Sequence, residues 1–294
     1  MAEIENTGVL PANGKTLEST LARLQDTIAE KQLNQAFSKA ALLLLPLIKK
    51  SAVIILLLAL WELAPRLGLA DRAFLPPFSV VLVAWWQLLV SGELISHITA
   101  SLIRAWGGYA LAISYAIPLG LAMGWYKGLS EVLTPLVETL RNTAALALFP
   151  VFILLLGIGE ASKLAIVIYA CSWPILLNTI SGVKNIDPLC IKSAQSMGVS
   201  QFALFRKVIL PATIPTIFIG VRLAGSISIL VLVAAEMIGA KAGLGYLIIY
   251  SQYNFQVPNM YAGIITISLI GLGVNKGLTY LGRRLTSWQP EVGA

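Results

Sequence analysis

The amino-acid sequence predicts an all-α integral membrane protein with six transmembrane helices, and three observations support this prediction. Apolar residues make up 57% of the 294 residues, and charged residues make up only 12%. The mean hydropathy is +0.81, and soluble domains carry about twice this charged fraction. The apolar residues also fall into runs of about 20 residues, which is the length that crosses a bilayer as a helix.

The chain divides into three regions along its length. Residues 1–40 form a polar tail and then a predicted amphipathic helix, in which apolar residues from Leu17 to Ile28 recur at helical spacing. We expect this helix to lie on the membrane surface, and contact with a partner is the alternative. Residues 41–288 form the predicted transmembrane domain, and residues 289–294 form a short C-terminal tail.

Six apolar runs within the transmembrane domain are predicted to span the bilayer. They cover residues 46–66, 102–125, 132–156, 162–183, 213–238 and 258–281. Between the first two runs, Pro76-Pro77 and Trp85-Trp86 indicate a segment that rests at the membrane interface, where aromatic side chains are enriched.

Small residues recur at every fourth position of the second predicted span. They are Gly108, Ala112, Ala116, Gly120 and Gly124. A stripe of small side chains lets another helix approach closely, so we expect it to pack within the helix bundle. Lining of a pore is the alternative.

The distribution of basic residues predicts which side of the membrane each loop faces. With the N-terminus inside, the inner side holds Lys49, Lys50, Lys127, Lys184, Lys192, Arg206, Lys207, Arg283 and Arg284. The outer side holds Arg66, Arg72, Lys163 and Lys241, which acidic neighbours offset. The positive-inside rule therefore places both termini in the cytoplasm. Because the basic residues flank apolar spans, the net charge of +7 does not indicate a nucleic-acid partner.

The composition argues against a catalytic or metal centre in this chain. The sequence has one histidine, His97, and two cysteines, Cys171 and Cys190, which lie at no metal-ligand spacing. Asn13-Gly14-Lys15-Thr16 resembles the end of a phosphate-binding loop, but Val9 stands where that loop needs a glycine. We therefore expect no enzymatic activity and no cofactor bound by this chain.

Residues 185–211 form a polar segment between the fourth and fifth spans, and their capping residues predict two short helices. Asp187 before a proline is an N-terminal cap, and Gly198 suits a left-handed C-terminal cap. Ser200 caps the second helix, and Pro211 is expected to end it before the next span. This predicted elbow presents apolar side chains to a groove on a partner, namely Met197, Phe202 and Phe205.

The elbow resembles the coupling loop of ATP-binding-cassette (ABC) importer permeases, whose consensus reads E-A-A-x3-G-x9-I-x-L-P. Four positions match this consensus at its spacing, namely Ala194, Gly198, Leu210 and Pro211. Lys192, Ser193 and Val208 replace the glutamate, the first alanine and the isoleucine. The resemblance implies a surface for an ATPase that comprises Lys192, Ser193, Ala194, Met197, Gly198, Phe202, Phe205, Leu210 and Pro211.

Further segments resemble the nitrate, sulfonate, taurine and bicarbonate importer permeases over about residues 50–288. They are Phe74-Leu75-Pro76-Pro77, Ser101-Leu102-Ile103-Arg104, Phe149-Pro150, Gly157-Ile158-Gly159-Glu160, Gly220-Val221-Arg222, Val233-Ala234-Ala235-Glu236-Met237-Ile238 and Gly243-Leu244-Gly245. One departure follows Arg141, where Asn142-Thr143-Ala144-Ala145-Leu146-Ala147 replaces a proline-rich stretch. We therefore expect the third span to be less kinked than in the family.

The resemblance implies the type I ABC importer permease fold, with a cytoplasmic coupling-helix elbow, in a bacterial-type inner membrane. It also implies the partners: a second copy of this chain, two cytoplasmic ATPase subunits that bind ATP and Mg²⁺, and an extracytoplasmic solute-binding protein. Residues 188–211 would couple to the ATPase. The solute would be a small oxyanion such as a sulfonate, taurine, nitrate or bicarbonate, and a neutral heterocycle is the alternative. The alternative is a stand-alone secondary transporter or channel, although no inverted repeat is evident in the sequence.

Polar groups within the predicted spans mark the candidate translocation pathway, because ionisable groups in lipid are costly unless they face a partner or water. The candidates are Arg141, Asn142, Thr143, Asn178, Arg222 and Ser226. For Arg141, attraction of an anion, an ion pair with Glu138 and a role as an interface anchor all stay open. Glu236 is predicted to support the external loop or the surface that receives a binding protein.

Overall fold

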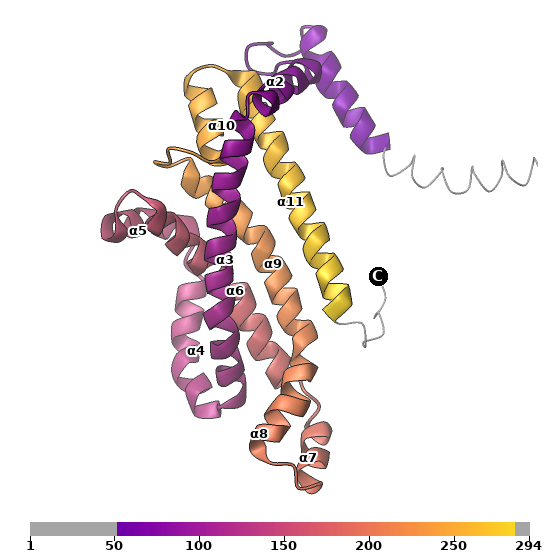
Figure 1. Ribbon diagram of the computed structural model, residues 1–294, viewed down its shortest axis with the longest axis vertical. Helices are drawn as coiled ribbons and strands as arrows, with labels where there is room; N and C mark the ends of the chain where they lie inside the picture. The colour runs from indigo at the N-terminus through magenta and orange to yellow at the C-terminus, as the bar shows by residue number, and fades with distance from the viewer. Residues whose placement is uncertain (1–51, 286–294) are drawn as a thin grey trace, which may run out of the picture. The chain divides into compact units, whose positions relative to one another are not determined.

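The computed structural model describes residues 52–285, and every regular element among them is helical (Figure 1). The chain divides into two compact units, Met1–Leu67 and Gly68–Ala294. In the first unit the structure describes a helix over residues 52–66, on which Glu62 and Arg66 form an ion pair.

Three predictions fall partly or wholly outside the described residues. They are the tail and amphipathic helix in residues 1–40, the beginning of the first predicted span, and the tail at residues 289–294.

The second unit contains helices of very different length. In chain order they are α2 (Phe78–Val90), α3 (Glu93–Trp125), α4 (Lys127–Arg141), the 3-10 turn η1 (Ala145–Leu148), α5 (Phe149–Leu156), α6 (Glu160–Lys184), α7 (Pro188–Ser196), α8 (Gln201–Leu204), the π turn η2 (Phe205–Ile209), α9 (Leu210–Glu236), α10 (Leu244–Tyr253) and α11 (Val257–Leu285).

Within residues 52–285, four helices are long and apolar enough to cross a membrane. They are Glu93–Trp125, Glu160–Lys184, Gln201–Glu236 and Val257–Arg284, and they match the second, fourth, fifth and sixth predicted spans. Helix α3 begins earlier than predicted, directly after Gly92, whose φ of 78° turns the chain into the helix. Helix α2 is a shorter apolar helix in the segment predicted to rest at the interface, and Trp85 Nε1 donates to Thr266 Oγ1 of α11 at 3.0 Å.

The third predicted span is sharply bent, and the comparison of its kink with that of the family stays a prediction. Its two parts, Lys127–Arg141 and Ala145–Leu156, meet at an angle of 86°. Ala144 between them has an extended backbone with φ −60° and ψ 121°. The short polar side chains of Asn142 and Thr143 favour such a break because they compete with the helix for backbone hydrogen bonds. The bend therefore forms without a proline-rich stretch.

Small residues bring α3 and α6 into close contact. A Cβ atom added to Gly108 would lie 2.7 Å from a methyl carbon of Val167, and one added to Gly120 would lie 2.7 Å from Thr179. Ala112 and Ala116, the stripe residues between these glycines, are 0% exposed. The stripe of small residues on α3 therefore packs within the bundle, as expected.

Helix α6 packs against α9 as closely as against α3, and the three helices form the core of the unit (Figure 1). A Cβ atom added to Gly220 of α9 would lie 2.5 Å from the carbonyl oxygen of Pro174. Between α3, α6 and α9, apolar side chains such as Met123, Ile175 and Leu232 are fully buried. This core holds α9 in place between α3 and α6. The candidate sites lie at the two ends of α9.

Candidate functional site

The elbow between α6 and α9 begins with α7, and its caps are those that the sequence predicts. At the N-terminus, Asp187 Oδ1 accepts a hydrogen bond from Leu189 N at 2.8 Å. At the C-terminus, Gly198 has a φ of 72°, and the next backbone N–H donates to the carbonyl of Ala194 at 3.3 Å. These bonds stabilise a helix that is too short to be stable alone.

The second helix of the elbow begins as predicted but does not end at Pro211. Ser200 Oγ accepts a hydrogen bond from Ala203 N at 3.4 Å, at the start of α8. From there the chain stays helical, so Gln201–Glu236 is one helix of 36 residues. The prediction that Pro211 ends the helix is therefore wrong.

A π-helical turn over Phe205–Ile209 explains how the helix passes Pro211. Leu210 N donates to the carbonyl of Phe205, five residues back, instead of four. A proline removes one backbone N–H and its ring crowds the preceding turn. The wider π turn next to Pro211 accommodates both the missing hydrogen bond and the crowding by the ring. The helix therefore continues past the proline.

The inner face of the elbow packs on the helix bundle. Ala194 is 5% exposed and Leu204 is 1% exposed, and both pack in a cluster with Leu121 of α3. Phe205 also belongs to this face, because it is partly buried with its ring centroid 6.5 Å from that of Trp125. Phe205 is thus less accessible than Met197 and Phe202, and its role in contacting a partner stays a prediction.

The outer face of the elbow carries most of the other predicted coupling residues. Met197 is 75% exposed and Phe202 is 74% exposed, with Leu189 at 68%. The exposed polar or small members are Lys192, Ser193, Gly198 and Pro211, whereas Leu210 is partly buried. Several exposed large apolar side chains on two adjoining short helices indicate a surface that a partner covers.

A largely apolar groove of about 690 Å³ opens beside the elbow. It lies between α8 and the C-terminal end of α3, and its lining residues are Pro118, Leu121, Ala122, Trp125, Tyr126, Gln201, Phe202 and Phe205. Phe202 thus belongs both to the exposed tip of the elbow and to the groove.

The candidate pathway residues lie at three places, and the first is the bend after α4. Arg141 is the last residue of α4 and is exposed, and Asn142 and Thr143 follow it at the bend. Tyr169 of α6 donates to the carbonyl of Leu140 at 2.5 Å, which ties the end of α4 to α6. Among the described residues, no ion pair joins Arg141 to its neighbour on α4, Glu138.

The other two places lie on α6 and on α9. Asn178 of α6 is partly buried, and its Nδ2 donates to the carbonyl of Pro174 at 2.8 Å. Arg222 of α9 lines a pocket that it shares with Arg283 of α11, and Ser226 is exposed one turn further along α9. The pathway assignment of these residues stays a prediction.

A buried polar cluster lies at the other end of α9, and its contacts are not among the predictions made from the sequence. Glu236 is 0% exposed, and its Oε1 accepts a hydrogen bond from Arg104 Nη1 at 2.7 Å. Its Oε2 accepts from Ser101 Oγ at 2.7 Å and from Gly245 N at 3.1 Å. A buried carboxylate is costly unless it is paired and hydrogen-bonded, and these donors satisfy that requirement.

Arg104 connects this carboxylate to two other parts of the chain. Its Nε and Nη2 atoms bind both carboxylate oxygens of Glu160, at the start of α6, with 2.8 Å between Nη2 and Oε1. Its Nη1 also donates to the carbonyl of Ala242 at 2.6 Å, in the turn before α10. We call His97, Ser101, Arg104, Glu160 and Glu236, with the turn that they hold, the Glu236 cluster.

The turn before α10 is shaped to fit against Glu236. Gly243 has a φ of 127°, and a Cβ atom added there would clash with the Glu236 carboxylate. Gly243 N donates to His97 Nδ1 at 3.1 Å, and Leu244 N donates to Ser101 Oγ at 2.8 Å. The three consecutive N–H groups of Gly243, Leu244 and Gly245 thus meet a side chain of α3 or the carboxylate of Glu236.

The sequence contained a signal for the Glu236 cluster. An ionisable residue inside an apolar span needs a partner, and both Arg104 and Glu236 stand in such spans. Pairing them requires knowing that α3 and α9 run side by side, which spacing along one chain does not reveal. Among the described residues, no group of histidine, cysteine or carboxylate side chains is placed to hold a metal ion.

The comparisons with known proteins agree on one protein family. A family model described as "Binding-protein-dependent transport system inner membrane component" matches residues 116–287. The taurine transport system permease protein TauC of Escherichia coli is 34% identical over 241 residues, which cover 80% of this chain and 88% of that protein. The putative aliphatic sulfonates transport permease protein SsuC of the same organism is 36% identical over 234 residues, with coverage of 80% and 89%.

Two solved structures show the same fold. The MetNI methionine ABC transporter aligns with a TM-score of 0.59 and 15% identity, over 66% of this chain and 96% of that one. An amino acid ABC transporter aligns with a TM-score of 0.54 and 18% identity, over 67% and 96%. The chain therefore belongs to the family of binding-protein-dependent transport system inner-membrane components, as a multi-pass ABC importer permease with the all-α fold that its sequence predicts.

Proposed function

We propose that this chain is the membrane-spanning subunit of an ATP-driven importer and that residues 188–211 couple it to a cytoplasmic ATPase. One observation carries the coupling. The elbow exposes Met197 and Phe202, and its second helix is continuous with the membrane-spanning α9. An ATPase that binds these side chains is connected directly to a span, with no flexible loop between them.

The proposed complex contains two copies of this chain, two ATPase subunits that bind ATP and Mg²⁺, and an extracytoplasmic solute-binding protein. This chain is its non-catalytic part. The positive-inside pattern supports cytoplasmic termini and a cytoplasmic elbow. The Glu236 cluster then lies at the outer side, where it shapes the turn between α9 and α10 that a binding protein would meet.

We further propose that the solute is a small oxyanion, with a sulfonate such as taurine first and nitrate or bicarbonate as alternatives. Two relatives that align with 80% of this chain, at 34% and 36% identity, are named for the transport of taurine and of aliphatic sulfonates. Arg141 at the bend of the third span is the candidate that would attract the anion, because it is exposed and lacks an acidic partner among the described ion pairs.

Reconstitution tests this proposal against a stand-alone transporter or channel. The chain is placed in liposomes alone, or together with the ATPase and the solute-binding protein from the same gene neighbourhood. We expect uptake of radiolabelled taurine only with both partners and ATP. Uptake by the chain alone, driven by an ion gradient, would show that it is a secondary transporter.

The solute itself is identified on the binding protein. Calorimetric titration with taurine, an alkanesulfonate, nitrate and bicarbonate is expected to show tight binding of one of them. Tight binding of an uncharged solute instead, with no affinity for any of the four, would overturn the oxyanion assignment and leave the ATP-driven mechanism intact.

A further inference from the structure

The elbow, residues 185–211, extends past the end of the membrane-spanning bundle, and Figure 1 shows α7 and α8 together at this end of the chain. Thr213 of α9 lies level with the end of α6, because a Cβ atom added to Gly182 would lie 3.5 Å from its side chain. Gln201, where the continuous helix begins, precedes Thr213 by twelve residues, which is about 18 Å at 1.5 Å per residue. The headgroup layer on each side of a bilayer is only about 5–8 Å thick. The tip of the elbow therefore lies beyond the lipid headgroups.

The charged side chains of the elbow are almost all basic. Lys192, Arg206 and Lys207 are exposed, and none of the ion pairs in residues 52–285 includes any of them. Asp187 is the only acidic residue of the elbow, and its Oδ1 accepts the capping hydrogen bond from the backbone of α7. The exposed surface therefore carries an excess of positive charge.

Two of these cations adjoin the exposed apolar side chains. Lys192 follows Leu189 by three residues on α7, and Arg206 follows Phe202 by four residues on the next helix. Residues at these spacings are neighbours on one face of a helix. Leu189 is 68% exposed and Phe202 is 74% exposed. Each of these apolar side chains, which a partner would cover, thus has a cation beside it.

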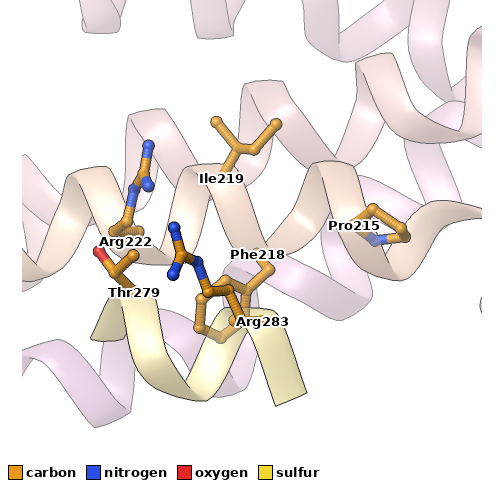
Figure 2. A pocket seen from close by; sticks show the side chains of 7 residues that line it. Pro215, Phe218, Ile219, Arg222, Thr279 and Arg283 are labelled. Atoms are coloured by element: carbon orange, nitrogen blue, oxygen red, sulfur yellow. The ribbon is translucent and has the colours of Figure 1, made fainter. Parts of the chain in front are cut away.

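Other basic residues of the bundle lie apart from this surface. Figure 2 shows Arg222 and Arg283 extending from α9 and α11, where they line a pocket between the two helices. Arg222 lies sixteen residues beyond Arg206 along the continuous helix, which is about 24 Å. The basic rim of the elbow is therefore separate from that pocket.

We propose that the elbow docks in an apolar groove of the ATPase whose rim carries carboxylates. The inference rests on the proposed function, in which the ATPase is the partner of the elbow. Burial of Leu189 and Phe202 brings Lys192 and Arg206 against the partner, where a cation without a counter-charge loses hydration and gains nothing in return. Carboxylates at the rim offset this loss, and they also steer the ATPase to the elbow.

Lys192 makes this charge pattern specific to the chain. It stands where the coupling-loop consensus has a glutamate, so the charge that faces this position is opposite to the one that a consensus elbow would attract. The ATPase that fits this chain is therefore expected to discriminate against an elbow with the consensus glutamate, because like charges across an interface are repulsive.

An acidic protein surface accounts for more of the elbow than anionic lipid does. Anionic headgroups also attract basic segments, but the attraction falls off within about 10 Å of the membrane surface. Headgroups would pair with Lys192 and Arg206 and leave the apolar side chains of Leu189 and Phe202 in water. A groove with an apolar floor and an acidic rim matches both kinds of side chain.

Zero-length cross-linking tests the inference. A carbodiimide joins a lysine amine to a carboxylate only where the two groups are in contact. The full-length chain is assembled with the ATPase in discs of phosphatidylcholine and treated with the reagent, and the joined peptides are identified by mass spectrometry. We expect a product between Lys192 and an aspartate or glutamate of the ATPase, which Lys192→Gln abolishes. A complex that forms without a cross-link from Lys192 or Lys207 to the ATPase would overturn the inference.

The rate of association gives a second measurement. At low salt, Lys192→Glu is expected to slow association with the ATPase about tenfold and to change dissociation much less, because a charge at the rim acts mainly on the encounter. Added salt should remove most of this difference. Lys192→Gln should have a smaller effect, since it removes attraction without adding repulsion. Equal association rates for wild type and Lys192→Glu would contradict the acidic rim.

Arg284→Glu is the matched control, because it makes the same kind of charge reversal on α11, where Arg284 packs over the ring of Tyr280 at 5.5 Å. If it slows association as much as Lys192→Glu, the effect is one of overall charge and the elbow rim is not the contact. An effect of Lys192→Glu that appears only in discs containing phosphatidylglycerol would assign the cation to lipid headgroups instead.

The inference and the proposed function can fail separately. A complex with the ATPase that transports solute, and whose formation depends neither on salt nor on Lys192, refutes the acidic rim and leaves the proposed function intact. If the chain and the ATPase do not associate under any condition, the proposed function fails and the inference falls with it.

Discussion

Arg104 holds the buried carboxylate of Glu236, with 2.7 Å between Nη1 and Oε1, while the rest of its guanidinium binds Glu160. Glu236 is the last residue of α9, and Glu160 is the first residue of α6. One side chain of α3 therefore fixes the ends of two spans that are far apart in the sequence.

Replacing Arg104 with methionine is expected to lower the free energy of unfolding by about 3–5 kcal/mol, because it leaves the Glu236 carboxylate buried without its cation. Denaturation of the purified chain in detergent measures the change. Glu160→Gln is the control, since the Glu160 side chain is 59% exposed and its loss should cost less than about 1 kcal/mol. Adding Glu236→Gln to the Arg104 variant should restore part of the stability; equal stability of the two single variants would contradict the role of the buried pair.

Gly243→Ala should be more harmful than the same change at Gly92. Both glycines have a positive φ, but only the Cβ at position 243 would clash with the Glu236 carboxylate, whereas position 92 has open space. We expect backbone strain of about 1–3 kcal/mol in both and a further ~1–3 kcal/mol at position 243. Thermal unfolding of the two variants side by side measures the difference, and equal midpoints would show that the turn yields to the added methyl group.

Gly120→Val tests the contact between α3 and α6. The new Cβ would lie 2.7 Å from Thr179, so the helices must separate, at a cost of about 1–3 kcal/mol. Gly277→Val in α11 is the control, because nothing lies within 4 Å of the added atom and the change should stay within about 0.5 kcal/mol. The yield of monodisperse protein and its unfolding midpoint report on both; a stable Gly120→Val variant would mean that α3 and α6 pack less closely than described.

Phe202→Glu is expected to weaken binding of the ATPase at least about tenfold without affecting the stability of the isolated chain. The side chain is 74% exposed at the tip of the elbow, so its loss removes an apolar anchor and little internal packing. Co-purification with the ATPase and binding-protein-stimulated ATP hydrolysis measure the effect. Tyr253→Glu, at a side chain that is 76% exposed on α10, should leave both unchanged, and normal hydrolysis by the Phe202 variant would exclude this side chain from the coupling surface.

The sequence predicts the elements whose causes are local. The caps at Asp187, Gly198 and Ser200 lie where the residue types require them, because capping depends on a few neighbouring residues. The long apolar spans can also be predicted from the sequence, because the thickness of the bilayer sets their length. The prediction at Pro211 is wrong because proline usually ends a helix, whereas here a π turn directly before it lets the helix continue.

The bend after Arg141 and the Glu236 cluster required the folded structure. The 86° bend forms at Asn142–Ala144, where the sequence has no proline to indicate it. Short polar side chains and packing against α6 favour the bend instead. The partners of Glu236 lie on α3 and in the turn before α10, more than a hundred residues away in the case of Arg104 and Ser101. No local pattern in the sequence indicates that residues so far apart along the chain lie in contact.

The continuous helix from Gln201 to Glu236 has a mechanical consequence. At 1.5 Å per residue its 36 residues extend about 54 Å, and near its middle Gly220 lies directly against the backbone of Pro174 on α6. That contact lies at about the same distance from the elbow and from Glu236, and Gly245 N in the first turn of α10 donates to Glu236 Oε2. One helix, with no loop in between, therefore joins the elbow to the turn before α10.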